Sequence, residues 1–282
     1  MNPDWLIPDW PAPSGVRALV TSRRGGFSGV PFDSMNLGDH VGDAPEKVAA
    51  NRAALQAAIG SRPVFLKQVH GSEVLVLDAA TADGRGADAC VTVQRHIACT
   101  IMVADCLPVL MTTADGGVVA AAHAGWRGLA GVGTYAGERA GTGVLESVYE
   151  SFSPLAPVKR AQAAMKIIAW LGPCIGPLAF EVGEEVKAAF EMTQPQASRF
   201  FASAGPGKYR ADLAGLARHR LQALGVADIY GNDSSPGWCT ASNPSRFFSH
   251  RRDAAFAGHG RGDGFGNGFG TTGRMAAAIW RI

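Results

Sequence analysis

Short apolar segments crowd the middle of the chain and do not alternate with helical segments. Six segments with the composition of β-strands follow one another at 63–69, 73–77, 89–94, 97–103, 107–113 and 117–122. Strands joined without intervening helices pair into antiparallel or mixed sheets, whereas a doubly wound parallel sheet needs a helix between its strands. The sequence therefore predicts an α/β protein of the α+β type, a single domain with mixed or antiparallel central sheets flanked by helices.

Strand and helix signals on either side of this region complete the expected fold. The helix at 45–59 has the clearest ends, since Asp43 and Glu46 form a capping-box pattern and Gly60 suits the C-terminal cap. The other expected strands are 16–21, 165–171, 226–231 and 274–281, and the other expected helices are 138–152, 181–192 and a segment that ends at residue 224.

Glycine is unusually frequent, at 36 of 282 residues, where soluble proteins average about 7%. So many glycines indicate many tight connections between elements. The segment 22–44 is rich in glycine, proline and aspartate and has no hydrophobic period. A loop of about 20 residues is uncommon in a compact domain unless it is functional. No linker-like stretch divides the chain, so we expect one domain over residues 1–282.

Charge, hydropathy and cysteine content argue against several classes of protein. The 26 Lys and Arg residues nearly balance the 24 Asp and Glu residues, and no basic stripe is visible, so nucleic acid is not an expected partner. The start of the chain lacks a secretory signal, and no apolar run reaches the roughly 18 residues of a membrane span. The five cysteines are odd in number and form no CxxC pair. They indicate reduced thiols in a cytoplasmic protein.

Three residues with chemically reactive side chains stand at the ends of expected strands. They are His70 in QVHG, Cys106 in ADCLP and His123 in AAHAGW. A thiolate with two imidazoles suits Zn²⁺ and also copper. Three protein ligands leave one tetrahedral position open, as in catalytic zinc sites. Asp105 precedes the thiol and could orient a ligand or move protons, and Gln68 could support His70 from the same strand face.

The expected hairpin around Asp115-Gly116 allows the separation of Cys106 and His123 to be predicted. A two-residue turn there pairs residues whose numbers sum to 231, so His123 faces Pro108. Cys106 and His123 are then diagonal neighbours on one face, about 7–8 Å apart. A turn centred one residue earlier places them directly opposite each other. A sum of 230 places them on opposite faces and breaks the pairing.

Spacing alone leaves other interpretations of these residues open. A cysteine at a strand end is commonly a small buried apolar residue. Cys106 and His123 could also form a metal-free pair of nucleophile and base. Several arginines, Arg127 after His123 and Arg251, Arg252 and Arg274 near the carboxyl end, suit recognition of phosphate or carboxylate. A structural ion pair is the commoner role of any one arginine.

The longest motifs resemble those of the bacterial laccase-domain family. Its members are also described as multicopper polyphenol oxidase-like proteins, purine nucleoside phosphorylases or peptidoglycan editing factors. The motifs are TSRRGGFS (21–28), SMNLGDHVGD (34–43), QVHG (68–71), ADCLPVL (104–110), AAAHAGWRGL (120–129), LGPCIGPLAFEVGEEV (171–186), FFSHRRD and TTGRM. The resemblance covers nearly the whole chain.

This resemblance implies one α/β domain that binds Zn²⁺ or Cu²⁺ through His70, Cys106 and His123. It implies phosphorolysis of adenosine, inosine and methylthioadenosine, together with deamination of adenosine. Purine nucleosides and phosphate are then the small-molecule partners. The residues that we predict to be catalytic are Asp105 and Arg127, and those that we predict to bind substrate are Asn36, Gln68, Arg251 and Arg252.

The sequence departs from the family pattern at a few places. His250 stands where the family usually has Tyr in its SYRRD motif. Two segments, about 132–142 and 254–270, have the character of loop insertions. The glycine-rich run at 258–270 is expected to be a flexible surface insertion. A nucleotide-binding loop is disfavoured there, because no strand precedes the run and no GK[ST] closes it.

Three other functions remain open from the sequence. One is copper-dependent oxidation of phenols, although 7 histidines without an HxH pair do not suit clustered copper sites. Another is hydrolytic editing of peptidoglycan precursors. The last is a metal-stabilised binding module without catalysis.

Overall fold

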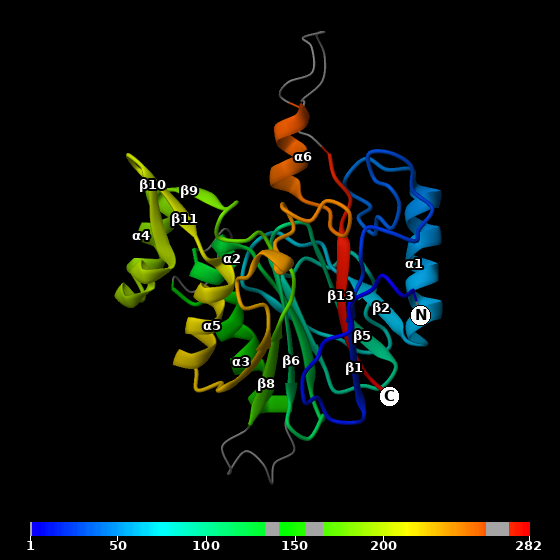
Figure 1. The fold of residues 1–282 in the computed structure, drawn as a ribbon. Helices are drawn as coiled ribbons and strands as arrows, with labels where there is room; N and C mark the ends of the chain where they lie inside the picture. Colours follow the sequence, from blue (N-terminus) through cyan, green and yellow to red (C-terminus); the bar gives the residue numbers. More distant parts are fainter. Residues whose placement is uncertain (1, 133–140, 156–165, 258–270) are drawn as a thin grey trace.

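The computed structural model describes residues 2–132, 141–155, 166–257 and 271–282. Two large β-sheets lie face to face, and a small third sheet lies to one side (Figure 1). The four-stranded sheet has the order β1 (Val16–Val20), β13 (Met275–Arg281), β5 (Ile97–Val103) and β2 (Arg62–Phe65). The six-stranded sheet has the order β12 (Asp228–Gly231), β8 (Ile167–Leu171), β6 (Leu107–Thr113), β7 (Val119–Ala124), β4 (Ala89–Thr92) and β3 (Val74–Val76). The third sheet has the order β10 (Phe201–Gly205), β11 (Lys208–Ala211) and β9 (Glu181–Gly183).

Helices cover the outer face of each large sheet. The helix α1 (Pro45–Ile59) packs on the four-stranded sheet, and α2 (Trp126–Ala130), α3 (Val144–Leu155) and α5 (Leu213–Ala223) lie on the side of the six-stranded sheet (Figure 1). The remaining helices are α4 (Glu184–Glu191), α6 (His250–Ala257) and the 3₁₀ turns η1 (Pro195–Phe200) and η2 (Pro236–Trp238). None of the helices within the described ranges is long and apolar enough to cross a membrane.

The central strands are apolar along their whole length because both faces of the sheets are covered. Side chains alternate between the two faces of a strand. In β5, Cys99 and Ile101 therefore face the core between the sheets, whereas Ala98 and Met102 face the core under α1. All seven residues of β5 are buried. This double burial explains why the sequence shows continuous apolar runs here rather than an alternation of apolar and polar residues.

The predicted fold class is confirmed, since the sheets are mostly antiparallel and helices flank them. Only the pairs β2–β5, β3–β4 and β8–β12 are parallel among the described strands. The segment 22–44 contains no helix or strand, as expected. The strand expected at 63–69 is shorter, because β2 ends at Phe65 and the chain then turns to approach Asp88.

Other boundaries also differ from the expectation. The helix expected at 181–192 begins with the short strand β9, and α3 begins at Val144 rather than at 138. The elements α2, α6 and β10 were not predicted, because each has eight residues or fewer and no clear hydrophobic period. The larger part of each predicted insertion, at 132–142 and at 254–270, lies outside the described residues.

The predicted register of the β6–β7 hairpin is confirmed. Leu107 pairs with Ala124 and Pro108 pairs with His123, which gives the sum of 231. The connection is longer than the expected two-residue turn, since the N–H of Thr113 donates to the carbonyl of Val118. The register nevertheless places Cys106 and His123 on the same side of the sheet.

Candidate metal centre

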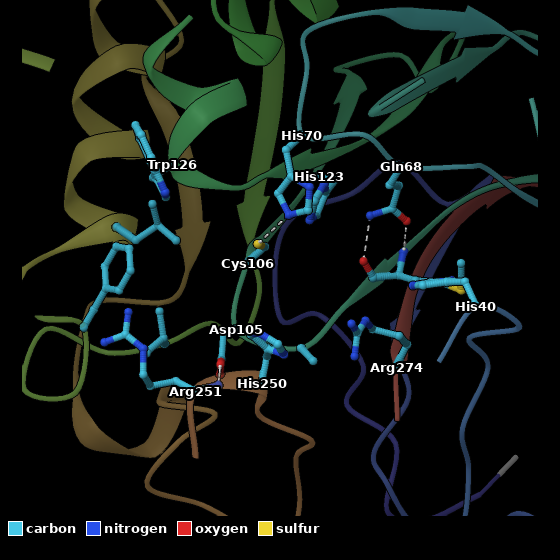
Figure 2. A pocket seen from close by; sticks show the side chains of 15 residues that line it. His40, Gln68, His70, Asp105, Cys106, His123, Trp126, His250, Arg251 and Arg274 are labelled. Atoms are coloured by element: carbon cyan, nitrogen blue, oxygen red, sulfur yellow. Dashed lines mark hydrogen bonds between the residues drawn. The ribbon is translucent and has the colours of Figure 1, made fainter. Parts of the chain in front are cut away.

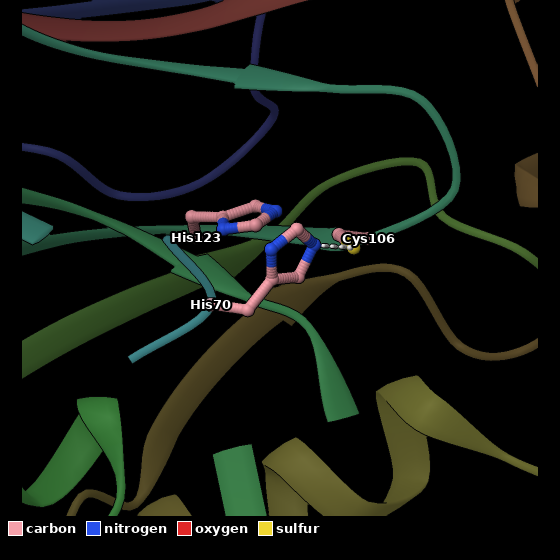
Figure 3. A group of neighbouring side chains, drawn as sticks. All are labelled: His70, Cys106 and His123. Atoms are coloured by element: carbon pink, nitrogen blue, oxygen red, sulfur yellow. Dashed lines mark hydrogen bonds between the residues drawn. The ribbon is translucent and has the colours of Figure 1, made fainter. Parts of the chain in front are cut away.

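The metal trio, as we call His70, Cys106 and His123, lies at the end of the central strands β6 and β7 of the six-stranded sheet (Figure 3). Their ligand atoms all lie within 4.8 Å of one another. The Sγ atom of Cys106 lies 3.9 Å from Nε2 of His70, and the two imidazole rings meet edge to face with centroids 4.8 Å apart. Three segments that are distant in the sequence, namely the loop after β2, the residue before β6 and the end of β7, supply these side chains.

Two residues of the site have backbone conformations that L-amino acids rarely adopt. His70 has φ of 64° and Asp105 has φ of 91°. Such conformations cost free energy and persist where surrounding contacts hold them. The N–H of Ile175 donates to the carbonyl of Asp105, and the Asp105 carboxylate accepts from the Thr240 hydroxyl at 2.5 Å and the Arg251 N–H at 2.6 Å. Asp105 thus ties the strand end that carries Cys106 to the loop after β8, to the loop of Thr240 and to the start of α6.

Asp88, immediately before β4, contacts the His123 imidazole and the backbone of the loop that carries His70. Its fully buried carboxylate accepts hydrogen bonds from the N–H groups of Val69, His70 and Gly71 at 2.8–3.0 Å. The same carboxylate lies 2.8 Å from Nδ1 of His123. Sequence reasoning missed this residue; the available signal was an acidic residue placed directly before an expected strand. Carboxylates that fix the free nitrogen of a ligating histidine are a regular part of metal sites.

The electrostatics of the trio favour a metal-binding thiolate. Burial opposes ionisation of the Cys106 thiol, but His123 and hydrogen bonds from both imidazoles outweigh it and lower the pKa of Cys106 to about 6. Burial also disfavours a charged His123 ring, yet Cys106 and Asp88 together raise its pKa to about 10. The pKa of Asp88 is lowered, since the contacts with His123 and the backbone N–H groups outweigh burial. Because the thiolate is the metal-binding form of cysteine, the trio is chemically suited to a cation.

The trio opens into a cavity of about 360 Å³, a size typical of small-molecule sites. Trp126, Ile175, Phe180 and Leu213, which we call the apolar wall, belong to or pack against the core cluster on the helix-covered side of the six-stranded sheet. The basic lining residues are His40, His250, Arg251 and Arg274. Figure 2 shows Trp126 and Arg251 on one side of the cavity, and His40 and Arg274 on the other.

Three of the residues predicted to contact substrate or to act in catalysis line this cavity. They are Gln68, Asp105 and Arg251. The Gln68 amide donates to the carbonyl of Met102 at 2.8 Å and accepts from its N–H at 2.7 Å (Figure 2). Gln68 was expected on a strand, but it lies in the loop after β2. Its two hydrogen bonds with Met102 join the loop that carries His70 to β5.

Three other predicted site residues, Asn36, Arg127 and Arg252, are not among the residues that line the cavity. Asn36 is fully buried, and its side-chain oxygen Oδ1 accepts from the backbone N–H of Arg274 at 2.9 Å. Arg252 donates to backbone carbonyls and pairs with Asp253. Arg127 is exposed and its guanidinium stacks on the Trp126 ring. These three side chains therefore lie outside the lining of the cavity.

The fold and the trio define a laccase-like domain. Residues 17–282 match the family model described as multi-copper polyphenol oxidoreductase laccase, and the chain therefore belongs to this family. The resemblance drawn from the motifs is confirmed.

Individual relatives are similar over their full length. The chain is 44% identical to a purine nucleoside phosphorylase of Pseudomonas aeruginosa and 43% identical to purine nucleoside phosphorylase YfiH of Escherichia coli, with 98% of each chain covered in both cases. The crystal structure of a Neisseria meningitidis protein, 38% identical, superposes with a TM-score of 0.80 over 99% of both chains. That of YlmD from Geobacillus stearothermophilus, 30% identical, gives 0.75 over 95% of this chain and 92% of its own.

Proposed function

We propose that this protein is a metal-dependent purine nucleoside phosphorylase. The observation that carries the proposal is the metal trio at the base of a cavity with an apolar wall, in a chain 43–44% identical to relatives of that name. The proposed substrates are adenosine, inosine and methylthioadenosine, each with inorganic phosphate. The apolar wall offers Trp126 and Phe180 to the flat face of a purine, since aromatic rings stack on planar groups.

The donor set fits a divalent cation. Two imidazoles and a thiolate suit Zn²⁺, which we propose as the resident ion, and Cu²⁺ is the alternative. When bound, such an ion supplies Lewis acidity toward an oxygen of the substrate. His70, Cys106 and His123 would hold it, and Asp88 would keep the His123 imidazole and the loop that carries His70 in place.

Phosphorolysis exchanges the purine base of the nucleoside for phosphate. In phosphorolysis, a phosphate oxygen forms a bond to C1′ of the ribose, the bond from C1′ to N9 of the purine breaks, and the phosphate proton passes to the leaving base.

We retain Asp105 as a catalytic candidate because it lines the cavity beside Cys106. The Thr240 hydroxyl and the Arg251 N–H hold its carboxylate in one orientation. A fixed carboxylate can position a substrate hydroxyl without reorganisation.

We extend the proposal to deamination of adenosine, in which water replaces the 6-amino group and ammonia leaves. The protein would then be both a pentosyltransferase and a hydrolase. All five cysteines are free thiols, which accords with the reducing cytoplasm that we propose as its compartment. No nucleic-acid partner is part of the proposal.

Copper-dependent oxidation of phenols is the second candidate, because the family model carries an oxidoreductase description. Within the described residues, the metal trio is the one cluster of three His, Cys, Asp or Glu side chains close enough to hold a metal. A single three-ligand site does not provide the several coppers that a multicopper oxidase needs. This observation favours the nucleoside reaction.

The test is turnover by purified, metal-loaded protein. Adenosine, inosine and methylthioadenosine are incubated with and without phosphate, and the products are separated by chromatography while metal content is measured. We expect phosphate-dependent release of free base by the wild type and by the control Arg95→Ala, whose exposed side chain bonds to the carbonyl of Ile282. Cys106→Ala and His123→Ala should lose both metal and turnover.

Two outcomes would overturn the proposal. Stoichiometric metal without nucleoside turnover would favour editing of peptidoglycan precursors or a binding role. Oxygen uptake with phenols by the copper-loaded protein, without base release, would favour the oxidase.

A further inference from the structure

Arg274, just before β13, places a positive charge inside the cavity. Figure 2 shows its guanidinium pointing into the cavity from the side opposite Trp126. One amino group, Nη1, donates to the carbonyls of Thr272 and Gly273 at 2.9 and 3.3 Å. Among the described residues, no hydrogen bond or ion pair involves Nε or Nη2 of Arg274, so these two nitrogens are available to a ligand. An arginine with one free edge can bind an oxyanion through two parallel hydrogen bonds.

The loop at 22–44 is built around this arginine. The buried Asn36 accepts from the Arg274 N–H at 2.9 Å, and the carbonyl of Arg274 accepts from the N–H of Leu37 at 3.0 Å. At Gly38, a Cβ atom would lie 2.8 Å from Cγ of Arg274. Glycine is needed there because the side-chain stem of Arg274 occupies that space. The arginine is therefore positioned before any ligand arrives, which reduces the entropy lost on binding.

The three arginines that the sequence assigned to the site lie away from the Arg274 side of the cavity. The Arg251 side chain donates to the carbonyl of Glu181 at 2.9 Å and lies over the Phe180 ring, on the side of the apolar wall. Arg252 and Arg127 do not line the cavity. Burial lowers the pKa of Arg274, and the nearby Cys106 and Asp105 oppose that lowering. A partly desolvated cation beside the trio is stabilised by an anionic ligand.

We propose that Arg274 binds the phosphate co-substrate, so that phosphate lies on the Arg274 side of the metal trio and the purine lies against the apolar wall. This inference rests on the proposed phosphorylase function and adds a specific residue and orientation to it. His40, which lines the cavity on the same side, faces the phosphate from the 22–44 loop. Asn36, predicted to bind substrate directly, acts instead by positioning Arg274.

The experiment compares Arg274→Ala and Arg274→Lys with the wild type and with Arg95→Ala, which removes one arginine charge from the far ends of β4 and β5. The KM for phosphate is measured at saturating inosine, and the KM for inosine at saturating phosphate. Loss of a charge-assisted, two-point contact should raise the phosphate KM of Arg274→Ala roughly 10- to 100-fold. Arg274→Lys should show a smaller rise, and the inosine KM and metal content should stay within about twofold.

A second variant tests the positioning. Gly38→Ala displaces the Arg274 stem without removing its charge, and it should raise the phosphate KM in the same direction. Titration calorimetry of the metal-loaded protein with inorganic phosphate, in the absence of nucleoside, provides a readout that does not require turnover. Binding should weaken in Arg274→Ala and stay unchanged in Arg95→Ala.

The outcomes separate this inference from the proposed function. Phosphorolysis with an unchanged phosphate KM in both Arg274 variants overturns the inference and leaves the function standing. Phosphate binding that depends on Arg274, without nucleoside turnover, supports the subsite and overturns the phosphorylase. Absence of phosphate binding and of turnover in the wild type overturns both. If Arg274→Ala does not fold, Arg274→Lys and Gly38→Ala decide.

Discussion

The Asp88 carboxylate lies 2.8 Å from Nδ1 of His123 and holds that imidazole in a fixed orientation within the metal trio. The same carboxylate accepts the backbone N–H groups of Val69, His70 and Gly71. One buried side chain therefore sets the ring of one ligand and the loop that carries another. Binding of a cation at the trio should depend on Asp88 although the residue does not belong to the trio.

Replacing Asp88 with Asn should weaken metal binding roughly 10- to 100-fold. Both carboxylate oxygens of Asp88 accept hydrogen bonds in the wild type, whereas the Asn amide has one oxygen and one NH₂ group. The NH₂ group would therefore face backbone N–H donors that lose their acceptor. Affinity for Zn²⁺ is measured by competition with a chromophoric chelator. The matched control is Asp78→Asn, an exposed carboxylate that bonds within its own turn. Equal Zn²⁺ affinity in Asp88→Asn and the wild type would contradict the role given to Asp88.

Alkylation of Cys106 in the metal-free protein should follow a pKa of about 6. The thiolate is the reactive form, so the rate with iodoacetamide should fall as the pH drops through 6 and should level off above it. The rate is followed by mass spectrometry of the Cys106 peptide, with Cys106→Ala as the blank. Because His123 is the main stabilising charge, His123→Ala should move the midpoint upward. A wild-type midpoint near that of an ordinary thiol would refute this description of the pair.

Removal of the Thr240 hydroxyl should slow turnover without removing the metal. Thr240 donates to Oδ1 of Asp105 at 2.5 Å, and both residues are buried. A hydrogen bond to a charged group contributes about 1.5–3 kcal/mol, so kcat of Thr240→Val should fall roughly tenfold or more. Thr240→Ser keeps the hydroxyl and should restore most of the rate. If Thr240→Ser is as slow as Thr240→Val, the hydroxyl does not restore the rate, and the hydrogen bond to Asp105 is not the cause of the loss.

The ion pair between Glu146 in α3 and Arg220 in α5 should matter for stability alone. Arg220 is 2% exposed and its Nε lies 2.8 Å from Oε1 of Glu146. Loss of one partner leaves a buried charge uncompensated, so Glu146→Leu should lower the free energy of unfolding by about 3–5 kcal/mol. The double variant Glu146→Leu with Arg220→Met should be less destabilised than the single one. Urea unfolding measures both, and a double variant that is worse than the single variant would argue against this explanation.

The sequence predicted those parts of the site that depend on local pattern. The β6–β7 register followed from one turn and from side-chain alternation, and it placed Cys106 and His123 together. His70 was grouped with them from its place at an expected strand end, and the family motifs implied the same three ligands. The conformation of the His70 loop was not predictable, because an apolar run before it read as a strand. Its true course depends on Asp88, which approaches it from 17 to 19 residues farther along the chain.

Residues that reach the site through tertiary contacts were also beyond sequence reasoning. Four arginines suited an anionic substrate, but Arg127, Arg251 and Arg252 were predicted as site residues and Arg274 was not. The packing of the 22–44 loop against β13 is what distinguishes Arg274 from Arg252. Asn36 illustrates the same limit: its motif marks a functional segment, while its side chain is buried and holds the backbone of Arg274.

The most direct test of the central proposal is identification of the sugar product by ³¹P nuclear magnetic resonance. Purified, metal-loaded protein is incubated with inosine and inorganic phosphate, with the Cys106→Ala variant alongside. Phosphorolysis at the metal trio predicts ribose 1-phosphate in an amount equal to the hypoxanthine released, and none from the variant. Release of hypoxanthine with free ribose, or an equal yield of ribose 1-phosphate from Cys106→Ala, would contradict it.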